Sequence, residues 1–243
     1  MDTIKKGYYI LLMFCLSCIQ TNDTYTAQEI VDKAIEKSGV VKLKEAKLSF
    51  DFRDMHYTAK RTRGNFVYTR SFDSVEDELS NNKFNRYIHG KKVQLSDSLA
   101  TVYSNSVNSV HYFSILPFYL NDKAVRKERL PNVKINNQEY YKIKVSFAEE
   151  GGGEDYQDVF IYWFHKESFS IDYLAYSYET DGGGMRFRET KNKQLIDGIH
   201  FNNYSNYKPT KEIDLIDIDK SFSKNELEKV SEIELNNIKV SFY

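Results

Sequence analysis

Histidine, cysteine and paired acidic residues are the side chains that most often hold metals or carry out catalysis, and this chain offers few useful arrangements of them. Its five histidines are His56, His89, His111, His165 and His200. No two of them are spaced to place metal ligands on one helix face, and there is no HExxH motif, no GxSxG turn and no cysteine beyond Cys18. The sequence therefore predicts no metal site, no cofactor and no catalytic centre.

His111 and Phe113 lie in a stretch, Ser104 to Asn121, whose apolar residues recur at helical spacing before Pro117. We expect a short helix here that packs on a sheet. His111 would then line a pocket as a hydrogen-bonding group, or it would be an ordinary packing histidine of the core.

Two arginines follow a glycine triplet at residues 182–184, and strand alternation places Arg186 and Arg188 on the face opposite Met185 and Phe187. A backbone nest followed by arginine can hold a carboxylate or a phosphate. The alternative is that both arginines pair with acidic residues on a neighbouring strand. A nucleotide-type phosphate loop is not indicated, because the chain has no GxxxxGK[ST] motif.

A second glycine triplet, at residues 151–153, lies among the carboxylates of Glu149, Glu150, Glu154 and Asp155. Oxygen-rich loops can bind calcium, but known calcium loops alternate their ligands with other residues. A solvated loop or a bulge is the alternative that we favour. Both triplets are expected to flank a tightly packed pair of strands, where glycine relieves the backbone.

The first residues are typical of an export signal. Lys5 and Lys6 precede an uncharged apolar run from Tyr8 to Leu16, which is too short to span a bilayer. Ser17-Cys18 resembles the lipobox of bacterial lipoproteins, although Cys15 replaces the usual leucine three places upstream. We predict a signal peptide over 1–17, a lipidated Cys18 with a tether over 18–25, and one domain over 26–243. A signal peptide that is cleaved nearby without lipidation is the alternative.

The charges balance, with 34 Lys and Arg against 35 Asp and Glu. A net charge of -1 gives no long-range attraction to phosphate, so we expect no nucleic-acid partner. Aromatic residues make up 15% of the chain, which favours a folded protein over a disordered one.

Periodicity predicts one helix followed by strands. Thr26 and Glu29 have capping-box spacing, and Gly39 supplies a stop, so we expect a helix over about 27–38. From Ala46 onward apolar residues alternate with period two, with hairpin signals between strands at Arg63-Gly64-Asn65, His89-Gly90-Lys91, Asn136-Asn137 and Asp197-Gly198.

Two later segments depart from simple alternation. Residues 158–165 are apolar on both faces and predict a strand that is covered on both sides. Near the end the phase slips at Asn236-Asn237, which predicts a bulge. The fold class is therefore mainly β, a strongly curved antiparallel sheet or open half-barrel, with an N-terminal helix and a short central helix packed on it.

The order of segments resembles that of the outer-membrane lipoprotein carriers (LolA-like proteins), which place an aromatic strand, a polar turn, a strand and then Asp-Gly before an apolar strand. More closely, residues from about 27 to 240 resemble an uncharacterised family of Bacteroidota lipoproteins. That resemblance is carried by residues 48–57 (LSFDFRDMHY), 103–113 (YSNSVNSVHYF), 149–176 and 178–189 (YETDGGGMRFRE). It implies attachment to the outer membrane of a Gram-negative bacterium, facing the periplasm.

We therefore expect a lipid-anchored protein that binds a lipid or other hydrophobic ligand in the concave face of the sheet. The candidate ligand-binding residues are His111, Phe113, Trp163, Arg186 and Arg188. One alternative is a structural or interaction lipoprotein with a filled core. Another is an enzyme of unknown reaction that uses His111 with Arg186 or Arg188. An aldolase is not supported, since that enzyme is a barrel of alternating strands and helices.

Overall fold

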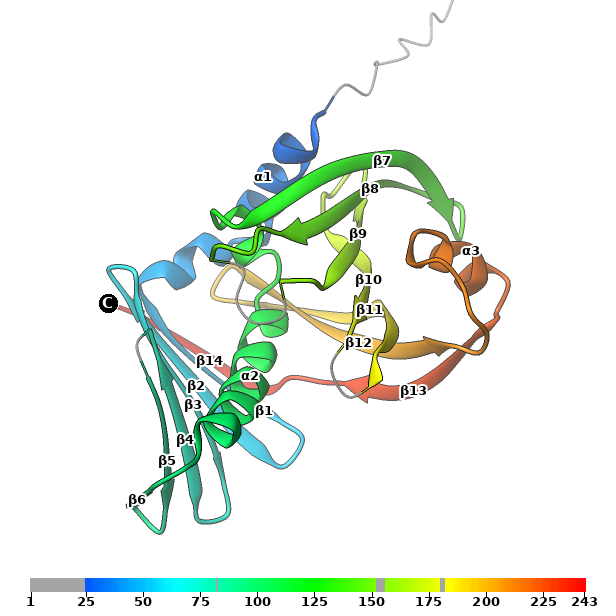
Figure 1. Ribbon diagram of the computed structural model, residues 1–243. Helices are drawn as coiled ribbons and strands as arrows, with labels where there is room; N and C mark the ends of the chain where they lie inside the picture. Colours follow the sequence, from blue (N-terminus) through cyan, green and yellow to red (C-terminus); the bar gives the residue numbers. More distant parts are fainter. Residues whose placement is uncertain (1–24, 82, 152–155, 180–181) are drawn as a thin grey trace, which may run out of the picture.

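The structure, a computed structural model, describes residues 25–81, 83–151, 156–179 and 182–243. In these ranges the strands form two open, seven-stranded antiparallel sheets, sheet A and sheet B (Figure 1). The predicted class, mainly antiparallel β with an N-terminal and a central helix, is confirmed. The sequence predicts one curved sheet, whereas the structure has two: helical segments follow the sixth strand, and the next strand begins sheet B.

Sheet A contains the early strands and also the final one. In spatial order its strands are β14 (Asn236–Phe242), β1 (Ala46–Phe52), β2 (Met55–Thr62), β3 (Asn65–Phe72), β4 (Val75–Ser80), β5 (Phe84–Ile88) and β6 (Lys91–Val93).

Sheet B is a continuous meander that curls strongly in Figure 1. Its strands are β13 (Leu227–Ile233), β12 (Ile199–Pro209), β11 (Gly184–Ile196), β10 (Ile171–Tyr178), β9 (Val159–His165), β8 (Gln138–Phe147) and β7 (Val125–Ile135).

The four predicted hairpin turns are present, and each joins its strands through two residues in the left-handed region of backbone conformation. Two-residue hairpin loops of this kind need positive φ at both positions, because only then does the turn follow the twist of the strands. The pairs are Arg63-Gly64, His89-Gly90, Asn136-Asn137 and Asp197-Gly198. Glycine and asparagine adopt this conformation at little cost, which explains the sequence signal.

Helix α1 (Ala27–Ser38) has the predicted boundaries. The capping box between Thr26 and Glu29 is complete, and Gly39 ends the helix at φ 72°. A Cβ at Gly39 would collide with the backbone carbonyl oxygen of Gly198, in the turn between β11 and β12. The end of the helix is therefore fixed closely against sheet B.

Helix α2 (Asp97–Ser114) is longer than predicted, since it begins at Asp97 with Ser96 as its N-cap. It packs on β3, β4 and β5 of sheet A. The other helical segments are η1 (Val40–Glu45), η2 (Phe118–Asn121), η4 (Leu215–Asp217) and α3 (Ile218–Ser223). No helix in the described ranges is both long and apolar enough to cross a membrane.

Strand β9 is covered on both faces, as predicted. Phe160 and Tyr162 are buried in one cluster together with Ile30 of α1, and Ile161 and Trp163 are buried in another on the opposite face.

The phase slip near the end of the chain marks the passage from one sheet to the other. Strand β13 ends at Ile233 in sheet B, and β14 begins at Asn236 beside β1 in sheet A. Asn237 has φ 51°, and the pairing of β14 with β1 shifts register between Ser49 and Asp51. The predicted bulge is confirmed, and it lies at the start of β14, just after the chain passes from sheet B to sheet A.

Candidate functional site

A cavity of about 520 Å³ lies between α2 and sheet B. Residues of α2, the end of β1 and strands β8 to β13 line it. The aromatic rings of the lining are those of Phe52, Tyr112, Phe113, Phe147, Phe160, Tyr176, Tyr178 and Tyr204. Pockets for small molecules commonly measure roughly 300–1,000 Å³. The cavity is therefore large enough to hold a small ligand or part of a hydrocarbon chain.

Three of these rings form a continuous apolar wall. Phe160 and Tyr176 face each other across β9 and β10 and are stacked, with ring centroids 5.4 Å apart. Phe113 approaches from α2, with centroid distances of 5.4 Å to Tyr176 and 6.1 Å to Phe160. The aromatic residues of the strands thus face an aromatic residue of the helix that covers them.

Arg188 lines the cavity although its side chain is almost completely buried, with 8% relative exposure. Its Nη2 donates a hydrogen bond to the Tyr176 hydroxyl at 2.9 Å, and its guanidinium carbon lies 4.0 Å from the centroid of the Phe113 ring. Its Nε is buried and has no hydrogen-bond partner in the part of the chain that the structure describes. The Arg188 guanidinium thus contacts the aromatic side chains of Tyr176 and Phe113, and its Nε remains available as a hydrogen-bond donor.

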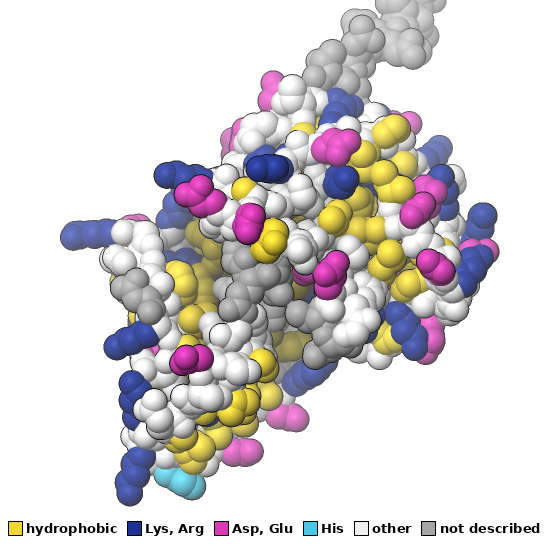
Figure 2. Space-filling model, viewed as in Figure 1, with side chains coloured by type: hydrophobic (Ala, Val, Ile, Leu, Met, Phe, Trp, Pro, Cys, Tyr) yellow, Lys and Arg dark blue, Asp and Glu magenta, His cyan; other side chains and the backbone are white. Residues whose placement is uncertain are grey.

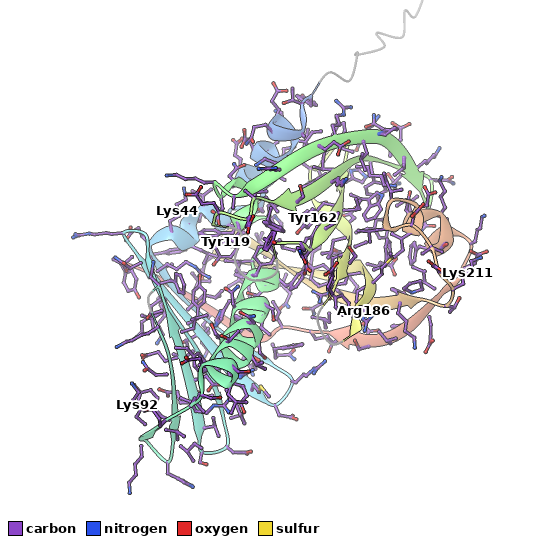
Figure 3. All side chains as sticks on the ribbon, viewed as in Figure 1. Lys44, Lys92, Tyr119, Tyr162, Arg186 and Lys211 are labelled. Atoms are coloured by element: carbon purple, nitrogen blue, oxygen red, sulfur yellow. The ribbon has the colours of Figure 1, made fainter. Side chains whose placement is uncertain are left out.

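Arg186 lies two residues earlier on β11 and also lines the cavity. Figure 3 shows it near the middle of the molecule. Its Nη1 donates to the backbone carbonyl of Met185 at 2.8 Å, and its guanidinium carbon lies 5.3 Å from the centroid of the Tyr178 ring.

The residues opposite the two arginines are not acidic. Arg186 faces Tyr176 of β10, and Arg188 lies between Leu174 of β10 and Asn206 of β12. Within the described ranges neither arginine forms an ion pair. The alternative of cross-strand pairing with acids therefore has no support in the structure.

Buried tyrosine hydroxyls add neutral polar groups to this region. Burial raises the pKa of Tyr112 to about 12, and it raises the pKa of Tyr162 and of Tyr204 above the ordinary value. These hydroxyls keep their protons at neutral pH. The Tyr112 and Tyr162 oxygens lie 3.4 Å apart.

The rim of the cavity is polar on the helix side. Asn105, Asn108 and Ser109 of α2 line it, and Asn108 and Ser109 are exposed. Asp158, just before β9, contributes a carboxylate to the lining. The cavity therefore opens to solvent beside α2.

His111, which the sequence suggests as a pocket residue, lies outside this cavity. It is fully buried, and its ring stacks on that of Tyr68 in sheet A with centroids 4.4 Å apart. Its Nε2 lies 3.3 Å from the Thr69 carbonyl oxygen, and burial lowers its pKa to about 3. On α2, His111 shares the sheet A face with Val107, four residues earlier, whereas Phe113 faces sheet B. His111 therefore does not meet Arg186 or Arg188, and the enzyme alternative loses its proposed constellation.

Trp163 also lies away from the cavity. It faces the opposite side of β9 from Phe160, and its ring packs on Phe187 with centroids 5.6 Å apart. The ammonium of Lys142 lies 5.3 Å from the centroid of the indole ring. Alternation along the strand explains the difference, because odd-numbered residues of β9 face the cluster that includes Ile218 of α3.

Of the aromatic residues in the lining, only Phe113 is among the sequence-based candidates. The others are Phe52, Tyr112, Phe147, Phe160, Tyr176, Tyr178 and Tyr204. The signal that identifies Phe160 and Tyr176 is their register with Arg186, since all three lie side by side across β9, β10 and β11. That register depends on the loop between β10 and β11, which is too long for the two-residue turn rules.

Several predictions concern residues outside those that the structure describes. They are the signal peptide over 1–17, the lipidated Cys18 and most of the tether over 18–25, together with Glu154 and Asp155 of the candidate calcium loop. Among the described residues, no group of three or more His, Cys, Asp or Glu side chains is arranged to hold a metal ion.

Similar folds occur among solved structures. The chain is similar to a DUF1329 family protein from Desulfovibrio piger, with 10% sequence identity, 88% of this chain and 92% of that chain covered, and a TM-score of 0.53. It is also similar to a LolA superfamily protein from Nitrosomonas europaea, with 11% identity, 89% and 92% coverage, and a TM-score of 0.48. At these identities the likeness concerns the fold alone. A search of curated proteins gave no match.

A sequence family extends over most of the chain. The pattern of a family of unknown function, DUF6503, matches residues 5–235, a range that includes α2, the cavity and both of its arginines. The predicted membership of an uncharacterised family is confirmed: the chain belongs to the DUF6503 family.

Proposed function

We propose that this protein binds a lipid or other hydrophobic ligand in the cavity between α2 and sheet B. The observation that carries the proposal is the aromatic wall of Phe113, Phe160 and Tyr176 around a space of about 520 Å³. Apolar surface removed from water contributes about 25 cal/mol per Å² to binding, so such a wall gives affinity without demanding one ligand structure.

We also propose that the protein is located at the cell envelope. A lipidated Cys18 would hold the protein to the outer membrane on the periplasmic side. Acyl chains contribute about 0.8 kcal/mol per buried methylene, so a multiply acylated cysteine is a durable anchor. Membrane lipids would then be the nearest hydrophobic ligands.

The direct test is a substitution that partly fills the cavity. Ser109→Trp places an indole at the rim, at an exposed position on α2 that lines the cavity. We expect the affinity for a neutral fluorescent probe, N-phenyl-1-naphthylamine, to fall by at least about tenfold, because the indole competes for the apolar wall. Fluorescence titration measures this, and mass spectrometry of lipid extracts from the purified protein reports what it carries.

Ser98→Trp is the matched control, since Ser98 is exposed on the same helix and does not line the cavity. This variant should bind the probe like the unmodified protein. If the unmodified protein binds no probe and repeatedly yields no lipid, the cavity is not a ligand site and the filled-core alternative holds.

A further inference from the structure

Arg188 presents a positive charge to the cavity, and none of the acidic residues that the structure describes forms an ion pair with it. Burying a charged group is costly unless it is paired and fully hydrogen-bonded. Arg188 is 8% exposed, and among the described residues its side chain makes one hydrogen bond, to the Tyr176 hydroxyl, while its buried Nε has no partner. To be fully paired, such a group needs a negatively charged partner and at least one more hydrogen-bond acceptor.

Sheet A shows how the same chain pairs two other arginines with a buried carboxylate. Asp77 is fully buried and accepts hydrogen bonds from Arg70 Nη2 at 2.6 Å and from Arg86 Nε at 2.6 Å. Among the described residues Arg61 has no carboxylate partner and its buried Nη1 has no hydrogen-bond partner, but its Nε and Nη2 donate to two tyrosine hydroxyls and it does not line the cavity. Within the described residues Arg188 has no carboxylate partner, unlike Arg70 and Arg86, and it lines the cavity, unlike Arg61.

Arg186 doubles the charge at this point. Residues two apart on a strand project from the same face and lie about 6–7 Å apart along it. Two guanidinium groups on one face of a strand can hold one carboxylate or phosphate between them, and arginine is the side chain best suited to such forked hydrogen bonding. Asp158 also lines the cavity and has interactions of its own. Neither arginine has an acidic residue opposite it on the adjacent strands.

The charged groups lie directly beside the apolar wall. The Arg188 guanidinium is 4.0 Å from the Phe113 ring centroid and bonds to Tyr176, and both rings belong to that wall. A ligand that satisfies both features has a negatively charged group attached to a hydrocarbon body.

On these grounds, and resting on the proposed function, we infer that Arg188 and Arg186 bind the anionic group of an amphiphile, a carboxylate or phosphate, whose hydrocarbon chain lies against Phe113, Phe160 and Tyr176. The anion supplies the missing partner of the Arg188 guanidinium, and the chain fills the aromatic part of the cavity. Ligands of this class are fatty acids and acidic lipids.

The experiment compares ligands that share one chain and differ in the head group. Calorimetric titration with dodecanoate, dodecyl phosphate, dodecanol and dodecyltrimethylammonium should give affinities about tenfold or more higher for the two anions than for dodecanol, since hydrogen bonds to charged groups are the strong ones. The cation should bind more weakly than dodecanol. Inorganic phosphate and acetate, which have the charge and no chain, should bind far more weakly than the two anionic amphiphiles.

Arg188→Met retains the apolar stem and removes the charge, so it should bring dodecanoate to the affinity of dodecanol. Arg188→Lys keeps the charge without the fork and should give an intermediate preference. Arg126→Met is the matched control, because Arg126 is exposed on β7 and does not line the cavity. It should keep the full preference for the anions.

The outcomes separate this inference from the proposed function. Equal binding of dodecanoate and dodecanol, unchanged in Arg188→Met, would overturn the anionic head group and leave hydrophobic binding intact. Binding of inorganic phosphate as tight as that of dodecyl phosphate would show a free-anion site instead. Failure of every amphiphile to bind would remove the proposed function itself.

A structural role for Arg188 predicts a different result from the same variant. If Arg188 stabilises the ligand-free fold, Arg188→Met should lower the thermal unfolding temperature markedly. If Arg188 binds a ligand instead, the ligand-free variant should unfold at the same or a higher temperature, because a buried unpaired charge has been removed. A marked loss of stability would therefore count against the inference.

Discussion

Buried polar side chains in this protein fall into groups with different chemistry. Asp77 with Arg70 and Arg86 is a closed ionic cluster, whereas Arg188 is a charge beside a cavity. His111 is a third kind, an ionisable ring kept neutral by burial between α2 and sheet A. Burial by itself therefore does not mark function, and what distinguishes Arg188 is the empty space next to it.

His111 should make stability depend on pH. Burial lowers its pKa from 6.5 to about 3, so between these values the unfolded chain binds a proton that the folded protein does not. The free energy of unfolding should therefore fall as the pH falls below about 6.5, with this residue contributing a slope of up to about 1.4 kcal/mol per pH unit. Urea denaturation at several pH values measures the slope.

His111→Phe keeps an aromatic ring and removes the titration, so its slope between pH 6 and about 4 should be smaller than that of the unmodified protein. His200→Phe, at an exposed position of β12, retains His111 and should keep the original slope. A slope that is the same in all three proteins would mean that His111 is protonated in the folded state.

Residue types and short-range periodicity identified part of the site in advance. Phe113, Arg186 and Arg188 are candidates from the sequence and all line the cavity. His111 and Trp163 were candidates for the same reason and lie elsewhere, because the choice of helix or strand face depends on which sheet each face meets. The local sequence pattern shows that a helix or strand has two distinct faces. Which sheet or helix each face contacts depends on the tertiary packing.

At the scale of elements, the turn between β11 and β12 and the end of α1 depend on each other. Gly39 ends α1 at φ 72°, and its α-carbon faces the carbonyl of Gly198 too closely for any side chain. Lys42 of η1 donates to the carbonyl of Asp197 at 3.1 Å in the same place. The end of α1 is thus held against sheet B by the close backbone contact at Gly39 and by the Lys42 side chain.

Substitution at two glycines separates backbone strain from this contact. Gly64 has φ 78° with nothing close to its α-carbon, so Gly64→Ala should cost about 1 kcal/mol of unfolding free energy through strain alone. Gly39→Ala has the same strain and also the collision with Gly198, and it should cost roughly 2–4 kcal/mol. Chemical denaturation of both variants gives the comparison.

Equal losses in the two variants would show that the end of α1 moves freely away from the turn. The larger loss at Gly39 would confirm that the helix is held there.

Elements whose signals are local were predicted well, and those that depend on partners were not. The two-residue turns and the capped ends of α1 carry their signals in a few adjacent residues. The first turns of α2 do not, since Leu99 and Val102 are 46% and 57% exposed and give no amphipathic pattern. The division into two sheets could not be predicted from the alternation of apolar and polar residues either, because the strands of both sheets alternate with the same period of two.

At the scale of the whole molecule, charge is spread rather than concentrated. Figure 2 shows Lys and Arg side chains mixed with Asp and Glu over the visible face. Such a surface gives little long-range attraction to a charged partner or to anionic lipid. Attachment to a membrane would therefore depend on the lipid anchor that we propose.

Cys18→Ser should release the protein from the membrane. The substitution removes the thiol that would be acylated, so the protein should move from the membrane fraction to the soluble fraction on cell fractionation and immunoblotting. Cys15→Ser, three residues upstream within the predicted signal peptide, should remain with the membrane. Unchanged membrane association of Cys18→Ser would refute the anchor.

The position of β14 affects the order in which the protein can be completed. Asn237 of β14 donates a hydrogen bond to Asp51 of β1 at 2.7 Å, a contact between residues 186 positions apart. Until residues 236–242 have been synthesised and delivered, one edge of β1 has no neighbour, and unpaired edges are where chains associate wrongly. Contacts between distant residues also form slowly. A protein is synthesised from its N-terminus, so β1 is among the first strands of sheet A to be made and β14 is the last. Until β14 pairs with β1, correct folding therefore competes with aggregation at the open edge of β1.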